Sequence, residues 1–226
     1  MIIKDYICDV GLKRNLNEDT YLINQENKYV LVSDGMGGHE RGDVASNIVV
    51  QTYNEIFNDS LNSTCIDENK IYDMINISNK ESTLKIKKFA RDYKIKNTMG
   101  ATIVGTIFDY ENNKCYYFHL GDSRLYKISD NKITQLTIDH SVESENKNVL
   151  SKAIGNFAAF DVDINSIDFG NNDIFFLCTD GVYNFISEDE ILNIILNNTM
   201  NYSEIIKKKI YNNGARDNLT FVIVEV

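Results

Sequence analysis

The sequence contains no proline and no tryptophan, and only 12 of its 226 residues are glycine. It also has no internal repeat, low-complexity tract or linker that would divide the chain. A chain of this length can bury a sizeable core without disulfide bonds. We therefore expect a single domain over residues 1–226.

Basic residues are outnumbered, because 23 Lys and Arg stand against 33 Asp and Glu, giving a formal net charge of -10. Sequence-independent affinity for nucleic acids comes mainly from clustered Lys and Arg. The short basic runs "KIKKF" and "KKKI" fit solvated helix faces. The composition therefore argues against a nucleic-acid partner.

Targeting segments and redox motifs are also missing. The amino terminus lacks the apolar stretch of a signal peptide, and no segment approaches the roughly 18–20 apolar residues of a membrane span. The four cysteines form no C-x-x-C pair, and three of them lie in apolar, strand-like runs. We therefore expect buried, reduced thiols in a soluble cytoplasmic protein with no membrane partner.

Short β-type runs rich in Val, Ile, Phe and Tyr make up much of the chain. The loops "DYENNK" and "SDNK" between such runs indicate hairpins, so much of the sheet should be antiparallel. We expect strands over 1–10, 20–25, 28–33, 100–109, 114–121, 124–129, 132–137, 173–179 and 218–226.

Helical periodicity is confined to a few segments. One runs from Asp43, a plausible cap, to about Asn58, and a longer one runs from about Glu68 to Tyr93. Near the carboxyl end, "SEDEILNIIL" opens with a Ser187/Glu190 capping box, and "SEIIKKKIY" follows as another short helix. This order predicts an α+β fold in which two packed, mainly antiparallel sheets carry helices on the outside.

Four aspartates stand at the ends of predicted strands. Asp34, Asp122 and Asp180 each end an apolar run, and Asp217 stands just before the last one. If they converge on one rim, their mutual repulsion calls for cations, and hard divalent ions favour oxygen ligands. The alternative for each is an ordinary turn, in which Asp forms local hydrogen bonds. The strand, small polar residue and Asp-Gly that recur at Asp34 and Asp180 favour a metal site.

Four glycines crowd into "SDGMGGHERGD": Gly35, Gly37, Gly38 and Gly42. A dinucleotide-type G-x-G-x-x-G starting at Gly35 would need glycine where Glu40 stands, and the chain has no G-x-x-x-x-G-K-[ST]. The cluster is therefore not a nucleotide cradle. Gly35 instead allows a close backbone approach beside Asp34.

Eight segments, in order, resemble the bacterial form of the type 2C metal-dependent Ser/Thr protein phosphatases. They cover nearly the whole chain. They are "GLKRNLNED", "SDGMGGHERGDVAS", "TMGATIV", "HLGDSRLY", "LTIDHS", "NVLSKAIG", "LCTDGVYN" and "RDNLTFVIV". The resemblance implies an α-β-β-α sandwich with an active site at one edge of two stacked sheets.

The resemblance also implies site roles. Two Mn²⁺ or Mg²⁺ ions would be bound directly by Asp34, the Gly35 carbonyl, Asp180 and Asp217. Residues that reach the metals through water would be Glu18 and Asp19. The guanidinium of Arg14 would bind the phosphoryl oxygens, although a surface ion pair with Glu18 is the alternative for this residue.

The implied reaction is in-line attack on phosphorus by a hydroxide that the two metals share, without a phosphoenzyme. The C-x5-R spacing of the cysteine-dependent phosphatases occurs once, at Cys8 and Arg14, and Cys8 lies in one of the apolar, strand-like runs. Met36 stands where animal members carry a histidine, and His39 nearby is expected to be structural. A metal-bound water is therefore the expected acid for the leaving group.

Two departures concern a third metal that many bacterial members hold. Asp122 would be its main ligand, but the residue four after Asp180, usually acidic, is Asn184. The flap segment between "DHS" and "NVLSKAIG" is also cut to the six residues "VESENK". Third-metal binding and substrate selection by the flap both depend on these positions.

The sequence thus predicts a metal-dependent phosphatase for phosphoserine and phosphothreonine in phosphoprotein substrates, which would reverse a bacterial-type Ser/Thr kinase. Two alternatives stay open. One is a non-catalytic regulatory or binding domain on the same fold, although none of its core metal carboxylates is missing. The other is a small-molecule phosphoesterase, which the short flap favours.

Overall fold

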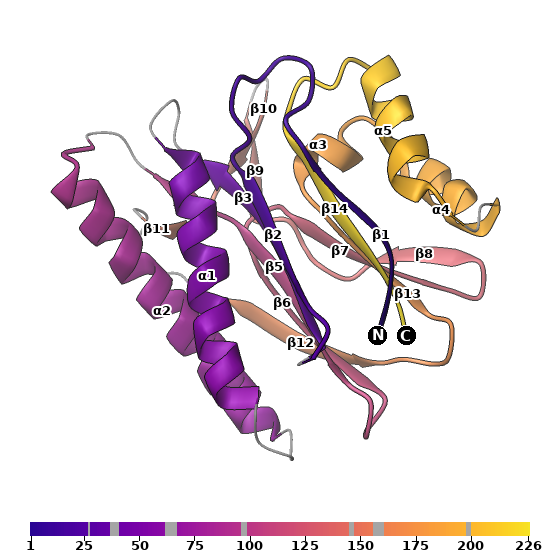
Figure 1. Cartoon of the computed structure of the whole chain (residues 1–226), viewed down its shortest axis with the longest axis horizontal. Coiled ribbons are helices and arrows are strands. Elements are labelled where there is room, and N and C mark those ends of the chain that lie inside the picture. The colour runs from indigo at the N-terminus through magenta and orange to yellow at the C-terminus, as the bar shows by residue number, and fades with distance from the viewer. Residues whose placement is uncertain are drawn as a thin grey trace.

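The structure is a computed structural model of the chain, and it describes residues 1–26, 28–36, 41–61, 67–95, 99–144, 147–155, 161–197 and 200–226. Two β-sheets face each other, and helices cover the outer face of each (Figure 1). The expected α+β sandwich of mainly antiparallel sheets is therefore confirmed. Among the described residues, no helix combines the length and the hydrophobicity that a membrane crossing needs.

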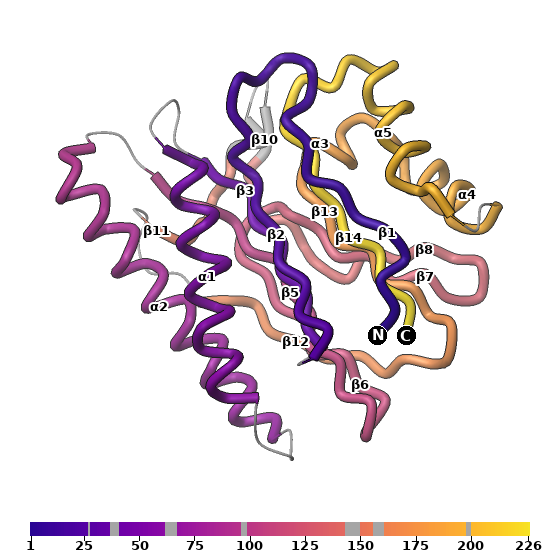
Figure 2. Tube along the Cα trace, viewed as in Figure 1, coloured from indigo at the N-terminus to yellow at the C-terminus, as the bar shows by residue number. Residues whose placement is uncertain are grey.

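The smaller of the two facing sheets has the strand order β1-β14-β13-β7-β8, and all of its pairings are antiparallel. Its strands are β1 (Ile2–Asp9), β7 (Arg124–Ser129), β8 (Lys132–Gln135), β13 (Ile174–Cys178) and β14 (Leu219–Glu225). The first and last strands of the chain lie side by side, so the two termini meet at one end of the sheet (Figure 2).

The larger sheet has the order β11-β4-β3-β5-β6-β12, with β2 paired to β3. Its strands are β2 (Asp19–Asn24), β3 (Tyr29–Met36), β4 (Gly100–Ala101), β5 (Ile103–Asp109), β6 (Lys114–Leu120), β11 (Ile154–Gly155) and β12 (Asp163–Asp168). The described residues of the segment expected to form a shortened flap, 142–147, lie in a separate hairpin of β9 (Ser141–Ser144) and β10 (Lys147–Leu150). Two residues of that six-residue segment, 145 and 146, lie outside the described residues.

Two helix groups cover the sheets. On the larger sheet lie α1 (Gly42–Leu61) and α2 (Glu68–Asp92), and on the smaller one lie α3 (Asp180–Tyr183), α4 (Glu188–Asn197) and α5 (Tyr202–Asn212). The expected capping box of α4 is present, since the Ser187 N–H donates to the Glu190 carboxylate at 3.0 Å and the Glu190 N–H to Ser187 Oγ at 3.3 Å.

The expectation that Asp43 caps α1 is wrong. The carbonyl of Arg41 accepts the first helical hydrogen bonds, from the N–H groups of Val44 and Ala45, so Arg41 holds the capping position. Asp43 lies in the first turn, where its carboxylate binds Arg41 Nε at 3.2 Å.

Alternation along the central strands divides the core into layers, because successive side chains of a strand point to opposite faces. In β3, Tyr29 and Leu31 pack with α1 and α2, whereas Val30 and Val32 lie between the sheets. In β14, Phe221 and Ile223 pack under α3 to α5, and the alternate valines face inward. Both faces of these strands are buried, which explains their nearly continuous apolar sequence.

The described cysteines are unpaired, as expected. Cys115 and Cys178 are buried, but Cys8 is only half-buried, because β1 is an edge strand of its sheet. Cys65 lies outside the described residues.

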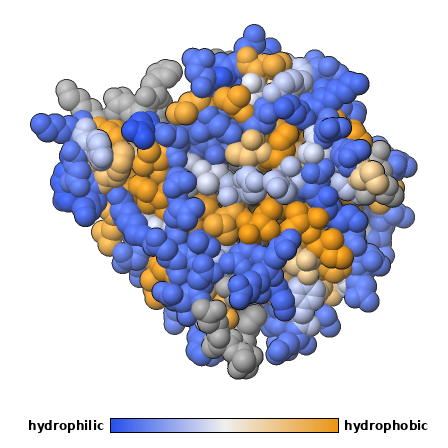
Figure 3. All heavy atoms as spheres, viewed as in Figure 1, coloured by the Kyte–Doolittle hydropathy of each residue, from blue (hydrophilic) through white to orange (hydrophobic). Residues whose placement is uncertain are grey.

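Strands β1 and β2 lie at the edges of their sheets on one face of the molecule. Apolar side chains gather there among polar ones (Figure 3). A shallow groove between the two edges is lined by Ile3, Tyr6, Tyr21, Leu22, Ile23 and Gln25.

Candidate active site

The carboxylates predicted at strand ends surround one cavity of about 310 Å³ at the rim of the two sheets. In the part of the chain that the structure describes, its lining holds five carboxylates and one cationic side chain, Arg14. The lining residues are Arg14, Glu18, Asp34, Gly35, Met36, Thr102, Asp122, Leu150, Asp180, Asp217 and Asn218. The structure therefore brings together the residues that the sequence proposes as metal ligands and phosphate binder.

Both sheets contribute to this rim. Asp34 lies in β3 of the larger sheet, and Asp122 follows β6. Asp180 opens α3 just after β13 of the smaller sheet, and Asp217 precedes β14. The strand was expected to end at Ser33, just before Asp34, and this is wrong. Strand β3 continues to Met36 because Gly35 and Met36 pair with β4, so Asp34 lies inside the strand.

Asp19 lies behind the cavity, opposite Asp34 in the pairing of β2 with β3. It is only 6 % exposed. One carboxylate oxygen accepts a hydrogen bond of 2.9 Å from the Thr179 hydroxyl, and the other, Oδ1, has no partner among the described residues. A buried carboxylate oxygen without a partner is costly, so this atom needs a donor or a cation.

The acidic groups raise one another's pKa. Burial raises the pKa of Asp180 to about 7, and the neighbouring carboxylates of Asp217 and Asp122 add to the effect. Burial also raises the pKa of Asp19 to about 7, against the hydroxyl contacts that lower it. The pKa of Asp34 is raised well above its ordinary range, first by burial and then by Asp19 and Asp180. Among the described residues that line this site, negative charge therefore exceeds positive charge.

Arg14 offsets only part of this negative charge. Its guanidinium lies 2.8 Å from an Asp217 oxygen and 3.9 Å from a Glu18 oxygen. The Arg14 side chain is 47 % exposed, so its outer N–H groups face solvent. The Glu18 ion pair weighed as an alternative is present, but it is the longer of the two contacts.

These observations together fit a pair of hard divalent cations. Carboxylate and carbonyl oxygens are the ligands that Mg²⁺ and Mn²⁺ prefer. Gly35 also suits a crowded site, because a Cβ there would lie 2.1 Å from the carbonyl oxygen of Gly42 and 2.6 Å from that of Glu18. The metal-ligand roles of individual residues stay predictions.

Polar residues that the sequence analysis did not single out organise the ligands. Asn218 accepts the Glu18 N–H at 2.9 Å and donates to the carbonyls of Val10 and Leu16, both at 3.0 Å, so it fastens the loop that carries Arg14. Thr102 Oγ1 accepts the Asp34 N–H at 2.9 Å and bonds Ser123 Oγ at 2.7 Å. Both residues lie in segments that carry the family resemblance, Thr102 in "TMGATIV" and Asn218 next to Asp217 in "RDNLTFVIV".

The residues tied to a third metal lie near the others. Asp122 lines the cavity, and its carbonyl accepts a hydrogen bond of 3.0 Å from the Tyr183 hydroxyl. Asn184 donates to an Asp180 oxygen at 3.2 Å. Met36 lines the cavity, whereas His39, with Gly37 and Gly38, lies outside the described residues.

The raised pKa values predict how pH acts on the metal-free protein. Asp19 and Asp180 bind protons more tightly in the folded chain than in the unfolded chain, so their contribution to stability falls as pH rises from about 4 through 7. Mg²⁺ removes this penalty by binding the ionised forms. We expect the difference in Tm between Mg²⁺-saturated and EDTA-treated protein to grow by roughly 4–8 °C from pH 5 to pH 8, which corresponds to about 2 kcal/mol.

Differential scanning fluorimetry across this pH range measures that difference. Other titrating groups cancel because the same protein is compared with and without metal. A difference that stays constant with pH would contradict the assignment of the raised pKa values.

The fold and the cavity together define a class. A cation-deficient carboxylate cluster suits two divalent metal ions, and a half-exposed arginine beside it suits a phosphoryl group, so the site is that of a metal-dependent hydrolase of phosphate esters. The family model described as protein phosphatase 2C matches residues 13–210. The chain belongs to the protein phosphatase 2C family, and the expected metal-dependent protein serine/threonine phosphatase is thereby confirmed.

Relatives of known sequence or structure align with nearly the whole chain. A serine/threonine phosphatase stp of Listeria monocytogenes is 28 % identical over 98 % of this chain and 94 % of its own length. The structure of PppA, a regulatory component of the T6SS in Pseudomonas aeruginosa, superposes with a TM-score of 0.86 at 23 % identity, covering 98 % of this chain and 96 % of that one. The catalytic domain of PstP in complex with two manganese ions has a TM-score of 0.82 at 24 % identity, with the same coverage.

Proposed function

We propose that this chain removes phosphate from phosphoserine and phosphothreonine in proteins, as one catalytic domain over residues 1–226. The observation that carries the proposal is the rim cavity, in which five carboxylates and one arginine meet among the described residues. Asp34, the Gly35 carbonyl, Asp180 and Asp217 would bind two Mn²⁺ or Mg²⁺ ions, and Glu18 and Asp19 would reach them through water. The two manganese ions named for the PstP structure support this number.

When bound, the two ions neutralise the carboxylates and the phosphoryl charge and supply hydroxide at neutral pH for in-line attack at phosphorus. The protein's own residues hold this arrangement. The Thr179 hydroxyl fixes one oxygen of Asp19, and the Glu18 carboxylate accepts the Gly42 N–H at 3.0 Å. Asn218 holds the Glu18 backbone, so Asp217 and the Arg14 loop keep a fixed separation.

Arg14 would bind the equatorial oxygens of the phosphoryl group as charge spreads in the transition state. Its contact with Asp217 leaves most of its N–H groups available, because the side chain is half exposed. No cysteine is among the cavity-lining residues that the structure describes, so no thiol is offered as a covalent nucleophile. Because Met36 occupies the position of the animal histidine, water is the proposed proton donor to the leaving alkoxide.

A phosphoprotein substrate implies a protein kinase that phosphorylates the same serine or threonine. We propose a bacterial-type Ser/Thr kinase as this partner, which is consistent with relatives named serine/threonine phosphatases. The kinase and this chain would act on shared substrates.

A phosphothreonine peptide and free phosphothreonine, each assayed with MnCl₂ and with EDTA, test the proposal. We expect turnover of the peptide only with metal, and a kcat/KM at least about tenfold higher for the peptide than for the free amino acid. Equal efficiency would favour a small-molecule phosphoesterase. Tight peptide binding without turnover would favour a regulatory domain.

Arg14→Ala tests the phosphate-binding role. We expect kcat/KM for the peptide to fall about 100-fold, because a charge-assisted contact to the transition state is lost. Metal affinity should not fall, since a cation is removed from beside Asp217. Steady-state kinetics and a Mn²⁺ titration of activity measure both quantities.

Arg41→Ala is the matched control for Arg14. Arg41 is an exposed arginine that pairs with Asp43 and does not line the cavity. Its replacement should change kcat/KM less than about twofold, because exposed ion pairs contribute little. Equal losses in the two variants would remove the specific role of Arg14.

A further inference from the structure

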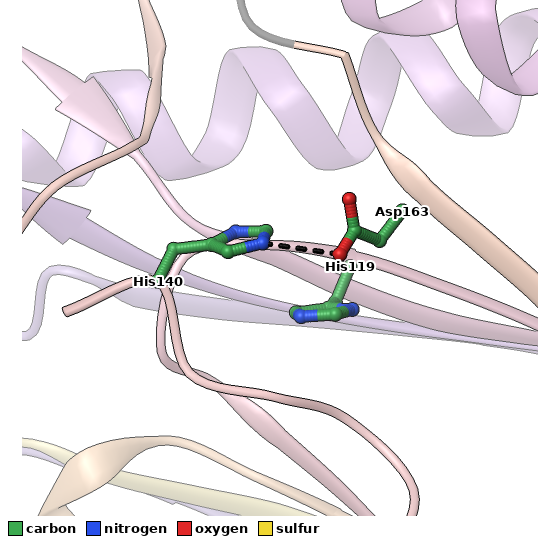
Figure 4. Close-up of side chains that lie close together, drawn as sticks. All are labelled: His119, His140 and Asp163. Carbon is green, nitrogen blue, oxygen red and sulfur yellow. Dashed lines mark hydrogen bonds and ion pairs between the residues drawn. The ribbon is translucent and has the colours of Figure 1, made fainter.

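Two of the chain's three histidines stack on each other beside the active-site rim. His119 is the penultimate residue of β6 and His140 follows β8, and their ring centroids lie 4.7 Å apart with 13° between the planes. Asp163 of β12 lies at the edge of the pair (Figure 4), with His140 Nε2 3.2 Å from its carboxylate. Both imidazoles are buried, at 2 % and 9 % exposure.

A cation site is one interpretation of this cluster, since three donor atoms lie within 4.8 Å of one another. The His119 ring supports it in part, because Nε2 lies 2.8 Å from the Ile138 carbonyl, whereas the buried Nδ1 has no partner among the described residues. His140 counts against it. The Gly121 N–H donates to His140 Nδ1 at 3.1 Å, so that nitrogen must be the acceptor and Nε2 carries the proton.

With its proton on Nε2, neutral His140 has no lone pair to offer a metal on the side of Asp163. Its Nε2–H instead donates to the Asp163 carboxylate, which fixes the tautomer. Only His119 and Asp163 would then be left as ligands, fewer than the three or four protein ligands of zinc sites. The contacts of this cluster therefore hold the His140 ring in one orientation and tautomer, and they do not form a cation site.

His140 is oriented toward Gly121, which it holds at two points. The Gly121 N–H donates to the ring, and the His140 N–H donates to the Gly121 carbonyl at 2.9 Å. The His140 carbonyl in turn accepts the Ser151 N–H at 2.8 Å, one residue after the cavity-lining Leu150. The loop after β6 and the end of the β9–β10 hairpin are therefore tied to one residue.

Gly121 directly precedes Asp122 and fixes its place. Gly121 has φ +119°, and a Cβ there would lie 2.6 Å from the Thr102 side chain, so the residue is wedged between Thr102 and His140. On the other side of Asp122, Ser123 bonds Thr102 Oγ1, which also accepts the Asp34 N–H. Movement at Gly121 would shift Asp122 relative to Asp34.

We propose that His140 is a positioning residue for Asp122, with Asp163 holding His140 in the tautomer that accepts the Gly121 N–H. This inference rests on the proposed function, because Asp122 lines the same cavity as the proposed metal ligands. Loss of the Gly121 contact would weaken Mn²⁺ binding at the rim, although His140 touches neither metal nor substrate.

Two conservative variants separate the contacts of His140. In His140→Asn the amide reaches the position of Nδ1, so it keeps an acceptor for Gly121 and loses Asp163. In His140→Gln the amide reaches the position of Nε2, so it keeps the contact with Asp163 and loses the side-chain acceptor for the Gly121 N–H. We expect the Mn²⁺ concentration for half-maximal peptide dephosphorylation to rise about fivefold in His140→Gln, the factor expected for one lost hydrogen bond, and less than twofold in His140→Asn.

His119→Leu is the control for packing, because it removes the other ring of the stack and leaves both Gly121 contacts. It should lower Tm at least as much as His140→Gln while leaving the Mn²⁺ requirement within twofold of wild type. Equal Mn²⁺ requirements in His140→Gln and His140→Asn would overturn the proposal. So would Zn²⁺ binding by wild type that both His140 variants and Asp163→Ala abolish.

An activity-independent measurement keeps this inference apart from the proposed function. In ¹H–¹⁵N spectra, the Gly121 amide should shift in His140→Gln and stay near its wild-type position in His140→Asn. Addition of Mg²⁺ should shift the Asp122 amide in wild type and less in His140→Gln. Wild type without turnover but with these shifts would reject the proposed function and retain the positioning role, whereas unchanged amides would reject the positioning role alone.

Discussion

Asp180→Asn should abolish metal-dependent turnover and, at the same time, stabilise the metal-free protein. We expect kcat/KM for a phosphothreonine peptide to fall by more than about 1,000-fold, because an amide cannot supply the negative charge that a divalent ion requires. The Tm in EDTA at pH 8 should rise by several degrees. Activity falls because the metal-bound site needs the Asp180 charge, whereas stability in EDTA rises because the metal-free site does not compensate that charge.

The gain in stability follows from the raised pKa of this carboxyl. Burial and the carboxylates of Asp217 and Asp122 hold the pKa of Asp180 near 7, so at pH 8 the folded, metal-free chain contains an ionised group that the unfolded chain accommodates better. Asparagine removes that charge and can keep a polar contact with Asn184. The stabilisation by added Mg²⁺ should correspondingly shrink.

Asp173→Asn is the matched control, because its carboxylate has the opposite environment. Asp173 pairs with Lys127 at 2.8 Å, and although burial opposes the charge, this contact lowers the pKa of Asp173 below its ordinary value. Its ionised form therefore stabilises the fold above about pH 4, and the asparagine variant should lose stability at pH 8 and keep its activity.

Thermal unfolding in EDTA measures the change in Tm for each variant, and kinetics with MnCl₂ measure the change in kcat/KM. If Asp180→Asn lowered the metal-free Tm as Asp173→Asn does, Asp180 would be a structural carboxylate whose charge the fold has compensated. Retained metal-dependent activity would remove it from the proposed ligand set.

The elements predicted from sequence were those whose burial is continuous or periodic. Strand β14 is buried on both faces, so its apolar run is unambiguous, and α2 shows one apolar stripe on a polar helix. Strand β12, "DINSID", was not predicted because it pairs with β6 at an edge and has only two apolar residues, Ile164 and Ile167, which do not alternate with polar ones. Its strand conformation depends on a partner that is distant in sequence.

Helix α3 was missed for a different reason. Its four residues, Asp180–Tyr183, are too few to form an isolated helix, because nucleation is costly. Tertiary contacts hold it, including the hydrogen bond from the Tyr183 hydroxyl to Asp122. The site was predictable as a set of residue types, but Asn218 and Thr102 act through hydrogen bonds that only the folded chain brings together.

Gly181→Ala should be among the most damaging substitutions of a single small residue. A Cβ at this position would lie 1.7 Å from the backbone oxygen of Asn218 and 2.8 Å from its carbonyl carbon. Both contacts are with backbone, so no side-chain rotation can relieve them. We expect a loss of about 3 kcal/mol or more in the free energy of unfolding, which is at the upper end for overpacking.

The close approach at Gly181 also sets the distance between two proposed metal ligands. Gly181 follows Asp180 and touches Asn218, which follows Asp217, so separating the two backbones moves the carboxylates apart. A misplacement of about 1 Å can cost about 100-fold in rate. Where the variant folds, kcat/KM should fall by about this factor even at saturating Mn²⁺.

Gly170→Ala provides the control for a glycine that has room. The nearest atom to its added Cβ would be an Asp173 oxygen at 3.9 Å, so the free energy of unfolding should change by less than about 0.5 kcal/mol and activity should be unaffected. Urea unfolding at matched metal concentration compares the two variants. A Gly181→Ala protein as stable and active as Gly170→Ala would show that α3 and the start of β14 separate freely, and that Asp180 and Asp217 do not depend on this contact for their placement.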